Sequence, residues 1–402
     1  MNPSLEIKNP SETTKLLDKI NTIGFLFGLN DVWITDVKFS SSFIYFYKIF
    51  DYVNEVINIY FSLSILGSFF TQHNLTERQA TDRLLFSIIL PGNMTMYYIL
   101  MFYKKETRSL LYQLAVVLKQ HQNDLALERE MIKKIKIFSI SLSGLVCATA
   151  VVQGAHAFYR TVYAGENFIT IPSAWPGVHD SSAAAGAMRT FLYIWWFPYA
   201  ARIMVAFLIF VTMLLVVCYQ FKNLQCYFYS LNEIFSDRKL SQTEKEFKYE
   251  QAFKVGIQMH AHTLWCKKQH QHVSKEMFGM EIFLVVGMLV AELITVLGSE
   301  RTLAQLSSMA FMTIATCLSL GFFMWNGGDI TIEASKLAEA IYSSGWQNCY
   351  GQSSVRIRKM VVGAIRQAQI PVVYKTLGVV QFSYESYVTL VKMTYTAVSV
   401  FY

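Results

Sequence analysis

Long runs of apolar residues separated by charged stretches are the dominant pattern of the chain. An α-helix needs about 20 mostly apolar residues to cross the hydrocarbon core of a bilayer. Seven such runs occur, at residues 43–70, 84–103, 137–159, 190–218, 277–299, 303–325 and 377–402. They are continuously apolar and do not alternate as the strands of a membrane β-barrel do. The pattern therefore predicts an all-α membrane protein with seven transmembrane helices.

The segment before the first apolar run is polar. It holds Lys8, Lys15 and Lys19 but no apolar stretch ahead of a small-residue cleavage site, so we expect no signal peptide. Residues 12–30 mix apolar and polar positions over a length too short to span a bilayer. They are predicted to form a helix that lies on the membrane surface or re-enters it.

Positively charged residues are divided unevenly between the loops. Lysine and arginine tend to be retained on the cytoplasmic side of membrane proteins. Two alternating sets of segments hold 27 and 5 of them. The first set is 1–41, 104–136, 219–275 and 327–375, and the second is 71–83, 160–189 and 300–302. The bias predicts a cytoplasmic N-terminus and, after seven crossings, an extracellular C-terminus.

Long cytoplasmic extensions join the transmembrane blocks. Apolar residues recur every three to four positions among the charges of 104–136 and 219–275, as in helices that continue beyond the bilayer. Apolar stripes outside the membrane need partners, so we expect a packed cytoplasmic anchor layer where subunits meet. The predicted blocks are 1–42 (cytoplasmic, with the surface helix), 43–218 (helices 1–4, with an outer lid loop at 160–189), 219–276 (cytoplasmic extension), 277–325 (helices 5 and 6), 326–376 (cytoplasmic anchor helices) and 377–402 (helix 7).

Composition and charge agree with a membrane protein, since 53% of the residues are hydrophobic and only 16% are charged. All six cysteines fall in spans or inner loops, so no outer disulfide is expected. Asn74 opens the sequon Asn74-Leu75-Thr76 in the first outer loop and is the predicted glycosylation site. The net charge of +7 comes from the cytoplasmic segments rather than from one basic face, so nucleic-acid binding is not expected.

Four histidines between the fourth and fifth spans raise the question of a metal site. His260, His262, His270 and His272 have HxH spacing, which places neighbours on different sides of a helix, and no acidic or cysteine cluster completes a ligand set. We predict a polar, partly solvated helix without a metal. No catalytic motif, P-loop or dinucleotide fingerprint occurs, so neither an enzyme nor a cofactor is expected.

Prolines mark an outer loop and two spans. Pro172, Trp175 and Pro176 in the second outer loop indicate either an ordered lid near the membrane interface or an ordinary interfacial anchor. Pro91 interrupts the second span and Pro198 the fourth. Such breaks bend helices and open space between them.

The last quarter of the chain has the most specific order of residues. After the sixth span come, in sequence, Gly328-Asp329-Ile330, a polar helix with Tyr342 and Trp346, a basic helix with Arg356, Arg358, Lys359 and Arg366, Gln369-Ile370-Pro371, and a final apolar helix with Lys392-Met393-Thr394-Tyr395-Thr396. This order resembles the signature of the insect odorant receptor family. The resemblance extends over the whole chain through its length, its seven spans and the proline and tryptophan loop.

The resemblance implies a subunit of a ligand-gated, non-selective channel for monovalent and divalent cations. In that family a tuned subunit assembles with a shared co-receptor as a tetramer in the plasma membrane of olfactory sensory neurons, and a homotetramer is the alternative. The seventh helix is split, here between Trp346 and Pro371. Because residues 219–275 form a shorter loop than the co-receptor has, the tuned subunit is favoured.

Helical spacing nominates a pore-lining stripe on the last helix. Thr394, Phe401 and Tyr402 lie three or four positions from Val398 and share its face. On periodicity alone this stripe packs against neighbouring helices, whereas by the resemblance Val398 sits at a hydrophobic gate, which can close by dewetting. Lys392 is costly within a span and is expected to face water or a polar partner.

A small volatile ligand requires an aromatic and aliphatic cavity with few polar groups. By the resemblance, this cavity lies toward the outside among the second, third, fourth and sixth spans. The candidates are Met94, Tyr97 and Tyr98 on the second, Val151, Gly154 and Phe158 on the third, Tyr199, Met204 and Val205 on the fourth, and Phe311 and Ile314 on the sixth. Gly154 is expected to leave room for the ligand and Phe158 to supply a ring, although each position alone is more often part of helix packing.

Three other classes of protein share parts of this pattern. A G-protein-coupled receptor has seven spans in the opposite orientation, and its acidic-Arg-Tyr triplet and NPxxY motif are absent from the sequence. A secondary transporter is disfavoured because seven spans do not divide into inverted repeats. An insect gustatory receptor shares fold and topology, but Tyr342, Trp346 and residues 392–396 favour the odorant receptor.

Overall fold

A computed structural model of the chain describes residues 10–29, 32–33, 40–298 and 303–399. Helices form almost all of this structure. In chain order the elements are α1 (Glu12–Leu26), α2 (Ser41–Thr71), α3 (Glu77–Phe102), α4 (Lys104–Tyr112), the π-helical turn η1 (Gln113–Val117), α5 (Leu118–His121), α6 (Leu125–Ala164), α7 (Ala183–Ser230), the 3₁₀ turn η2 (Leu231–Ser236), α8 (Gln242–Gly298), α9 (Leu303–Tyr342), the 3₁₀ turn η3 (Trp346–Asn348), α10 (Ser354–Ala368), strands β1 (Lys375–Thr376) and β2 (Val380–Gln381), and α11 (Tyr384–Ser399).

Among the described residues, six helices are long and apolar enough to cross a membrane. These are α2, α3, α6, α7, α8 and α9, and they contain the first six predicted spans. The chain is therefore a multi-pass helical membrane protein. Helices α6 to α9 continue well beyond the apolar runs, because their stripes of buried side chains extend into the polar segments.

The seventh predicted span begins later than the apolar pattern indicated. Leu377 and Gly378 both take positive φ angles, of 52° and 74°, and turn the chain into a short antiparallel hairpin. In this hairpin Lys375 faces Gln381, and Thr376 faces Val380. Residues 377–383 thus lie outside the helix that was predicted from 377, and α11 starts at Tyr384.

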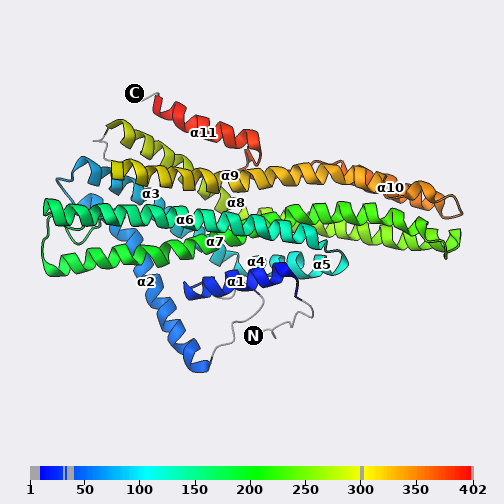
Figure 1. Cartoon of the computed structure of the whole chain (residues 1–402), viewed down its shortest axis with the longest axis horizontal. Coiled ribbons are helices and arrows are strands. Elements are labelled where there is room, and N and C mark those ends of the chain that lie inside the picture. Colours follow the sequence, from blue (N-terminus) through cyan, green and yellow to red (C-terminus); the bar gives the residue numbers. More distant parts are fainter. Residues whose placement is uncertain (1–9, 30–31, 34–39, 299–302, 400–402) are drawn as a thin grey trace.

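Helices α6, α7, α8 and α9 run side by side along the long axis of the molecule (Figure 1), and α7 packs against the other three. Its most apolar stretch is 89% buried inside the chain, against 28% for that of α6. Helix α10 lies at one end of this bundle, and α11 lies against α8 and α9 toward the other end. Helix α7 therefore forms the centre of the core.

Local signals define where the helices begin and end. Side-chain oxygens cap the first free N–H groups of five helices, as expected for serine, threonine and aspartate at N-termini. The capping residues are Ser11, Ser40, Thr76, Asp124 and Ser182. Helix α6 ends at Gly165, whose φ of 68° favours glycine.

Two glycines permit close approach between helices that form the core. A Cβ on Gly92 of α3 would lie 2.3 Å from Cδ2 of Leu284 on α8. A Cβ on Gly327 of α9 would lie 2.4 Å from Cδ2 of Phe382, which directly precedes α11. The absence of a side chain at Gly327 thus lets the start of α11 pack directly on α9.

A buried ion pair joins three of the spanning helices. Arg202 of α7 is 1% exposed, and its Nη2 lies 2.6 Å from Oε2 of Glu55 on α2. The guanidinium also donates to the hydroxyl of Tyr97 on α3 and lies 3.7 Å from the centre of that ring. Tyr98 donates its hydroxyl proton to Glu55. An uncompensated charge inside a bilayer is costly, so this pairing strongly constrains α2, α3 and α7.

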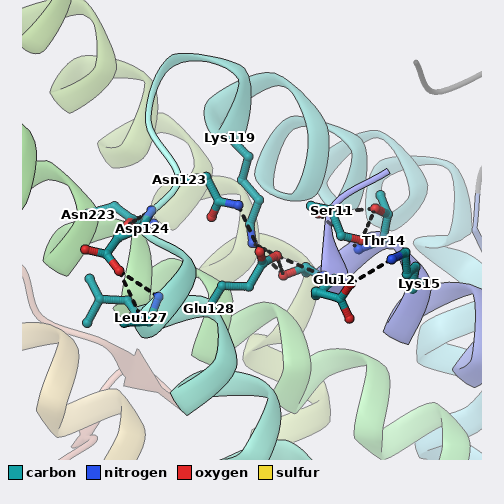
Figure 2. A network of polar contacts seen from close by, with 12 residues as sticks. Ser11, Glu12, Thr14, Lys15, Lys119, Asn123, Asp124, Leu127, Glu128 and Asn223 are labelled. Carbon is teal, nitrogen blue, oxygen red and sulfur yellow. Dashed lines mark hydrogen bonds and ion pairs between the residues drawn. The ribbon is translucent and has the colours of Figure 1, made fainter. Parts of the chain in front are cut away.

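A second polar network holds the N-terminal helix against the bundle (Figure 2). Oε1 of Glu128 accepts hydrogen bonds from the backbone N–H of Thr13 at 2.9 Å, from its hydroxyl at 2.6 Å, and from Lys119. Oε2 accepts from Asn123 at 2.9 Å. Burial lowers the pKa of Lys119, and the Glu128 carboxylate opposes this shift. The buried carboxylate of Glu128 thus ties helix α1 to α6.

Replacing that carboxylate is expected to loosen α1. Glu128→Gln keeps the size of the side chain but leaves the Lys119 ammonium buried without a counter-charge. Breaking a buried pair in this way costs roughly 3–5 kcal/mol. Hydrogen–deuterium exchange on the purified protein should show faster exchange over residues 12–26.

A matched control lies in the same network. Glu12 pairs with Lys15 at 2.7 Å, and both side chains are more than half exposed, so Glu12→Gln should leave exchange over α1 unchanged. Equal exchange in the Glu128→Gln protein and the wild type would show that apolar packing alone holds α1.

Candidate functional site

A cavity of about 170 Å³ lies between α3, α6, α7, α8 and α9. We call it the central cavity. An apolar cavity of about 150 Å³ is large enough to hold benzene. Its lining residues are Ile89, Asn93 and Met96 on α3, Leu142, Val146 and Thr149 on α6, Trp196, Tyr199, Ala200, Ile203, Met204 and Phe207 on α7, Glu281, Leu284, Val285 and Met288 on α8, and Met312, Ala315, Thr316 and Ser319 on α9.

Aromatic contacts fix the wall that α7 contributes. The hydroxyl of Tyr199 donates to the backbone carbonyl of Leu90 at 2.6 Å, and its ring meets Phe61 edge-on at 5.5 Å. The indole of Trp196 meets Phe86 edge-on at 5.7 Å. Both rings are therefore held by α2 or α3, so this wall is preformed in the chain.

The polar lining is concentrated on α8 and α9. The hydroxyl oxygen of Ser319 lies 2.6 Å from Oε1 of Glu281 and 2.9 Å from the backbone carbonyl oxygen of Thr316. The hydroxyl of Thr316 donates to the backbone carbonyl of Met312 at 2.7 Å. On α6, the hydroxyl of Thr149 donates to the carbonyl of Leu145 at 3.0 Å. A mostly apolar cavity with a few polar groups is the usual form of a small-molecule site.

A larger apolar groove of about 420 Å³ lies beside the central cavity, between α1, α6 and α7. Ile20 and Ile23 of α1 form one of its edges. It shares four lining residues with the central cavity: Val146, Trp196, Ala200 and Met204. The two spaces are thus separated by side chains of α6 and α7.

The residues predicted on the second and fourth spans have different positions. Tyr199 and Met204 line the central cavity, and Met204 and Val205 line the neighbouring groove. Met94 and Tyr97 are buried but line neither space, and Tyr97 binds Arg202. Tyr98 is 43% exposed and contacts Glu55.

The residues predicted on the third and sixth spans are not gathered around the cavity. Val151 and Phe158 are 55% and 64% exposed on the surface of the chain, and Ile314 is 53% exposed. Phe311 is partly buried and lines neither space. The space beside Gly154 is filled by Tyr193 of α7, since a Cβ there would lie 2.0 Å from its hydroxyl oxygen.

Apart from Tyr199 and Met204, none of the lining residues was among the sequence candidates. The missed residues include Glu281, Ser319, Thr149 and Trp196. The signal for Glu281 is present in the sequence, because a carboxyl inside an apolar run marks a functional position by default. Thr149 and Trp196 carry no comparable signal, since helical rotation alone decides whether they face the cavity.

Helix α11 has one packed face and one exposed face. Thr394 of the predicted pore stripe is buried, and its hydroxyl donates to the carbonyl of Val391. The exposed face carries the polar residues Glu385, Thr389, Lys392 and Thr396, spaced three or four positions apart. Val398 belongs to α11, but its side chain is not among those described, and Phe401 and Tyr402 lie outside the described residues.

The other predicted features lie at the ends of the spans. Asn74 is exposed in the turn between α2 and α3 and has a φ of 57°. The loop with Pro172, Trp175 and Pro176 is held by Gln72 of α2, which donates to the carbonyl of Ser173 at 2.9 Å. Arg189 of α7 donates to the carbonyl of Gly177 at 2.6 Å.

The prediction of a partly solvated histidine segment is wrong for two of its members. His260 and His270 are buried. The ring nitrogens of His270 lie 3.1 Å from the hydroxyl of Tyr374 and 3.1 Å from the carbonyl of Phe210. This histidine therefore joins α8 to α7 and to the segment before the hairpin. Among the described residues, no group of histidine, cysteine and acidic side chains is arranged to hold a metal ion.

Comparisons with known proteins agree with this geometry. The family model described as 7tm Odorant receptor matches residues 76–395. The structure of the insect olfactory receptor OR5 from Machilis hrabei has a TM-score of 0.77 at 11% identity and covers 96% of this chain and 97% of that chain. Its complex with eugenol has a TM-score of 0.74 at 11% identity and covers 96% and 98%. No curated protein sequence matches the chain.

The contact between Gly154 and Tyr193 yields a test of how α6 and α7 pack. Gly154→Ala should displace the Tyr193 ring, break its hydrogen bond to the carbonyl of Ala150, and destabilise the folded chain by about 1–3 kcal/mol. The measurement is thermal unfolding of the purified receptor. The double variant Gly154→Ala/Tyr193→Leu should recover part of the loss, because the shorter side chain removes the clash.

Gly144 supplies the control on the same helix. Nothing lies within 4 Å of the Cβ position there, so Gly144→Ala should be neutral or slightly stabilising. If Gly154→Ala unfolds at the wild-type temperature, the packing of Tyr193 against α6 is not a stabilising contact.

Proposed function

The chain belongs to the insect odorant receptor family, and on that premise we propose that it is the odorant-binding subunit of a ligand-gated, non-selective cation channel. One observation carries the proposal for this chain. The central cavity is lined by five helices, has a mostly apolar wall and has the volume of a small volatile molecule. The related OR5 receptor has been solved in complex with eugenol, which is a ligand of this size class.

The proposed topology has seven crossings, with the N-terminus in the cytoplasm and α11 as the last crossing. The excess of lysine and arginine in alternate segments supports this orientation. It places Asn74 outside, where its exposed side chain is available for glycosylation. The receptor would then reside in the plasma membrane of olfactory sensory neurons.

Ligand binding in the cavity has a direct structural route to α11. Met312, Ala315 and Ser319 of the cavity lie on α9, and Gly327 on the same helix contacts Phe382 at the start of α11. Tyr384 of α11 also donates to Oδ1 of Asp329 at 2.7 Å. A ligand that binds one arrangement of α9 more tightly than another therefore shifts the position of α11.

The pore is proposed to form where α11 helices of four subunits meet, with the odorant co-receptor as the partner. The exposed face of α11 supports this assignment, because the ammonium of Lys392 lies on it and a cation inside a bilayer needs water or a polar partner. Val398 is proposed as the gate on the family resemblance alone, because Thr394, one turn earlier on the same face, is buried within the chain. Phe401 and Tyr402 belong to the same proposed stripe. A hydrophobic ring at Val398 would block ions by dewetting when the channel is closed.

Filling the central cavity is expected to reduce the response to odorants. Ala315 is 7% exposed and lines the cavity, so Ala315→Phe places a ring inside it. We expect the odorant concentration for half-maximal current to rise about tenfold or more, corresponding to about 1.4 kcal/mol of lost binding. The measurement is whole-cell current against odorant concentration, with surface expression as a control.

Val151→Phe makes a comparable change on the surface of the chain and should leave this concentration unchanged, because Val151 is 55% exposed. An unchanged response in Ala315→Phe, at normal surface expression, would exclude the central cavity as the ligand site.

The gate assignment has its own test. Val398→Ala shortens the proposed apolar constriction, so resting conductance should rise or ion selectivity should change. Val362→Ala on α10, where the side chain is 66% exposed, is the control and should leave permeation unchanged. Identical currents and reversal potentials in Val398→Ala and the wild type would remove Val398 from the gate.

A further inference from the structure

One side chain of the central cavity is a buried carboxyl that faces no cationic side chain among the described residues. Glu281 is 8% exposed and lies within the apolar part of α8. Its only partner among the described residues is the hydroxyl of Ser319, at 2.6 Å, and no described cationic side chain pairs with it. A carboxyl in this position is costly unless an occupant of the cavity satisfies it.

The neighbouring hydroxyl groups have no proton to donate to an occupant of the cavity. Thr316 and Thr149 donate their protons to backbone carbonyls of their own helices, and the proton of Ser319 is taken either by Glu281 or by the backbone carbonyl of Thr316. Each hydroxyl therefore offers an occupant only lone pairs. Asn93 also lines the cavity, and its amide offers both a donor and an acceptor. Two lining rings carry polar atoms as well: the hydroxyl of Tyr199, which donates to the carbonyl of Leu90, and the indole N–H of Trp196. The polar corner of the cavity is consequently rich in acceptors.

The rest of the lining shows where the hydrocarbon part of an occupant would lie. Trp196, Met204 and Phe207 of α7 form an apolar wall of the cavity, whereas Glu281 and Ser319 belong to α8 and α9. A molecule in this space contacts apolar side chains with one part and the carboxyl with another. The cavity thus has the chemical polarity of a short hydrocarbon with one polar end.

We propose that Glu281 makes the central cavity selective for odorants that carry a hydrogen-bond donor, that is, a hydroxyl or an amine. The inference rests on the proposed function and adds the class of ligand. An ionised carboxyl accepts the donated proton in a hydrogen bond. A protonated carboxyl both donates and accepts, and a hydroxyl group matches both roles.

Ligands that carry only hydrogen-bond acceptors pair with fewer of the polar groups of the cavity. An ether, ester or ketone can pair with the protonated acid but has no proton for the carboxylate or for the lone pairs of the hydroxyl groups. An amine has a further option, because the proton of the acid can move to the amine nitrogen. The products are an ammonium and a carboxylate, which pair inside the cavity. A site that leaves buried polar groups unpaired discriminates strongly against the ligand that fails to pair them.

The experiment compares ligands of equal size that differ only in the polar group. The probes are 1-hexanol, hexylamine, methyl pentyl ether and heptane, together with equivalent sets on branched, cyclic and aromatic skeletons. Currents are recorded from cells that express the full chain with an insect odorant co-receptor. The wild type should respond to the alcohol or the amine at concentrations about tenfold below those of the matched ether.

Two substitutions at Glu281 distinguish its effect on alcohols from its effect on amines. Glu281→Met removes both the charge and the acceptor, and the half-maximal concentrations of the matched alcohol, amine and ether should converge within about threefold. Responses to the ether and the alkane should persist, which shows that the variant is assembled. Glu281→Gln retains a donor and an acceptor without the charge, so it should keep the preference for the alcohol and lose the preference for the amine.

Glu292→Gln is the matched control. Glu292 is also buried on α8, but it hydrogen-bonds Thr313 and lines a separate small polar space with Asp82 and Gln153. This variant should keep the wild-type rank order. A wild type that prefers the ether, or a Glu281→Met variant that keeps the preference for the donor, would overturn the assignment of Glu281. Currents with none of the probes, at normal surface expression, would instead overturn the proposed channel function.

Discussion

The arrangement of the spanning helices depends on one charge that cannot remain alone inside a membrane. Arg202 occupies the middle of α7, and Nη2 of its guanidinium is paired with Glu55 of α2 and Tyr97 of α3. Removing a charge from water is tolerable only when close partners replace the solvent. The pair therefore determines how α7 is rotated relative to α2 and α3. That rotation places Tyr199 and Met204, within one turn of Arg202, in the cavity wall.

Different helices contribute the aromatic and the hydrogen-bonding side chains of the cavity. Helix α7 supplies rings and methionine side chains that are held from behind by α2, α3 and α6. Helices α8 and α9 supply Glu281, Thr316 and Ser319, which meet across the interface between those two helices. The aromatic rings of the wall thus come from α7, whereas Glu281 and two of the hydroxyl groups come from α8 and α9. Apolar residues of α8 and α9, such as Leu284 and Met312, complete the lining.

Sequence reasoning predicted the spans well and the facing of their side chains poorly. Apolar length alone identifies six of the helices, because the bilayer thickness imposes it. Apolar length does not reveal how α6 is rotated about its axis. Val151 was predicted as a ligand contact, whereas Val146 and Thr149 line the cavity. Tyr97 and Tyr98 were predicted to contact the ligand, but they pair with Arg202 and Glu55. These partners lie on other spans, so the sequence of the second span alone did not reveal the pairing. Such pairings between distant helices have no signature in local periodicity.

The glycine at the junction of α9 and α11 has a mechanical consequence. Because Gly327 has no side chain, Phe382 packs closely against α9 at the junction between α9 and α11. Ser319 lies eight residues earlier on the same uninterrupted helix, a distance of about 12 Å along its axis. The stretch between the cavity wall and this junction is one continuous helix. A displacement of α9 at the cavity would therefore reach the start of α11 without crossing a loop.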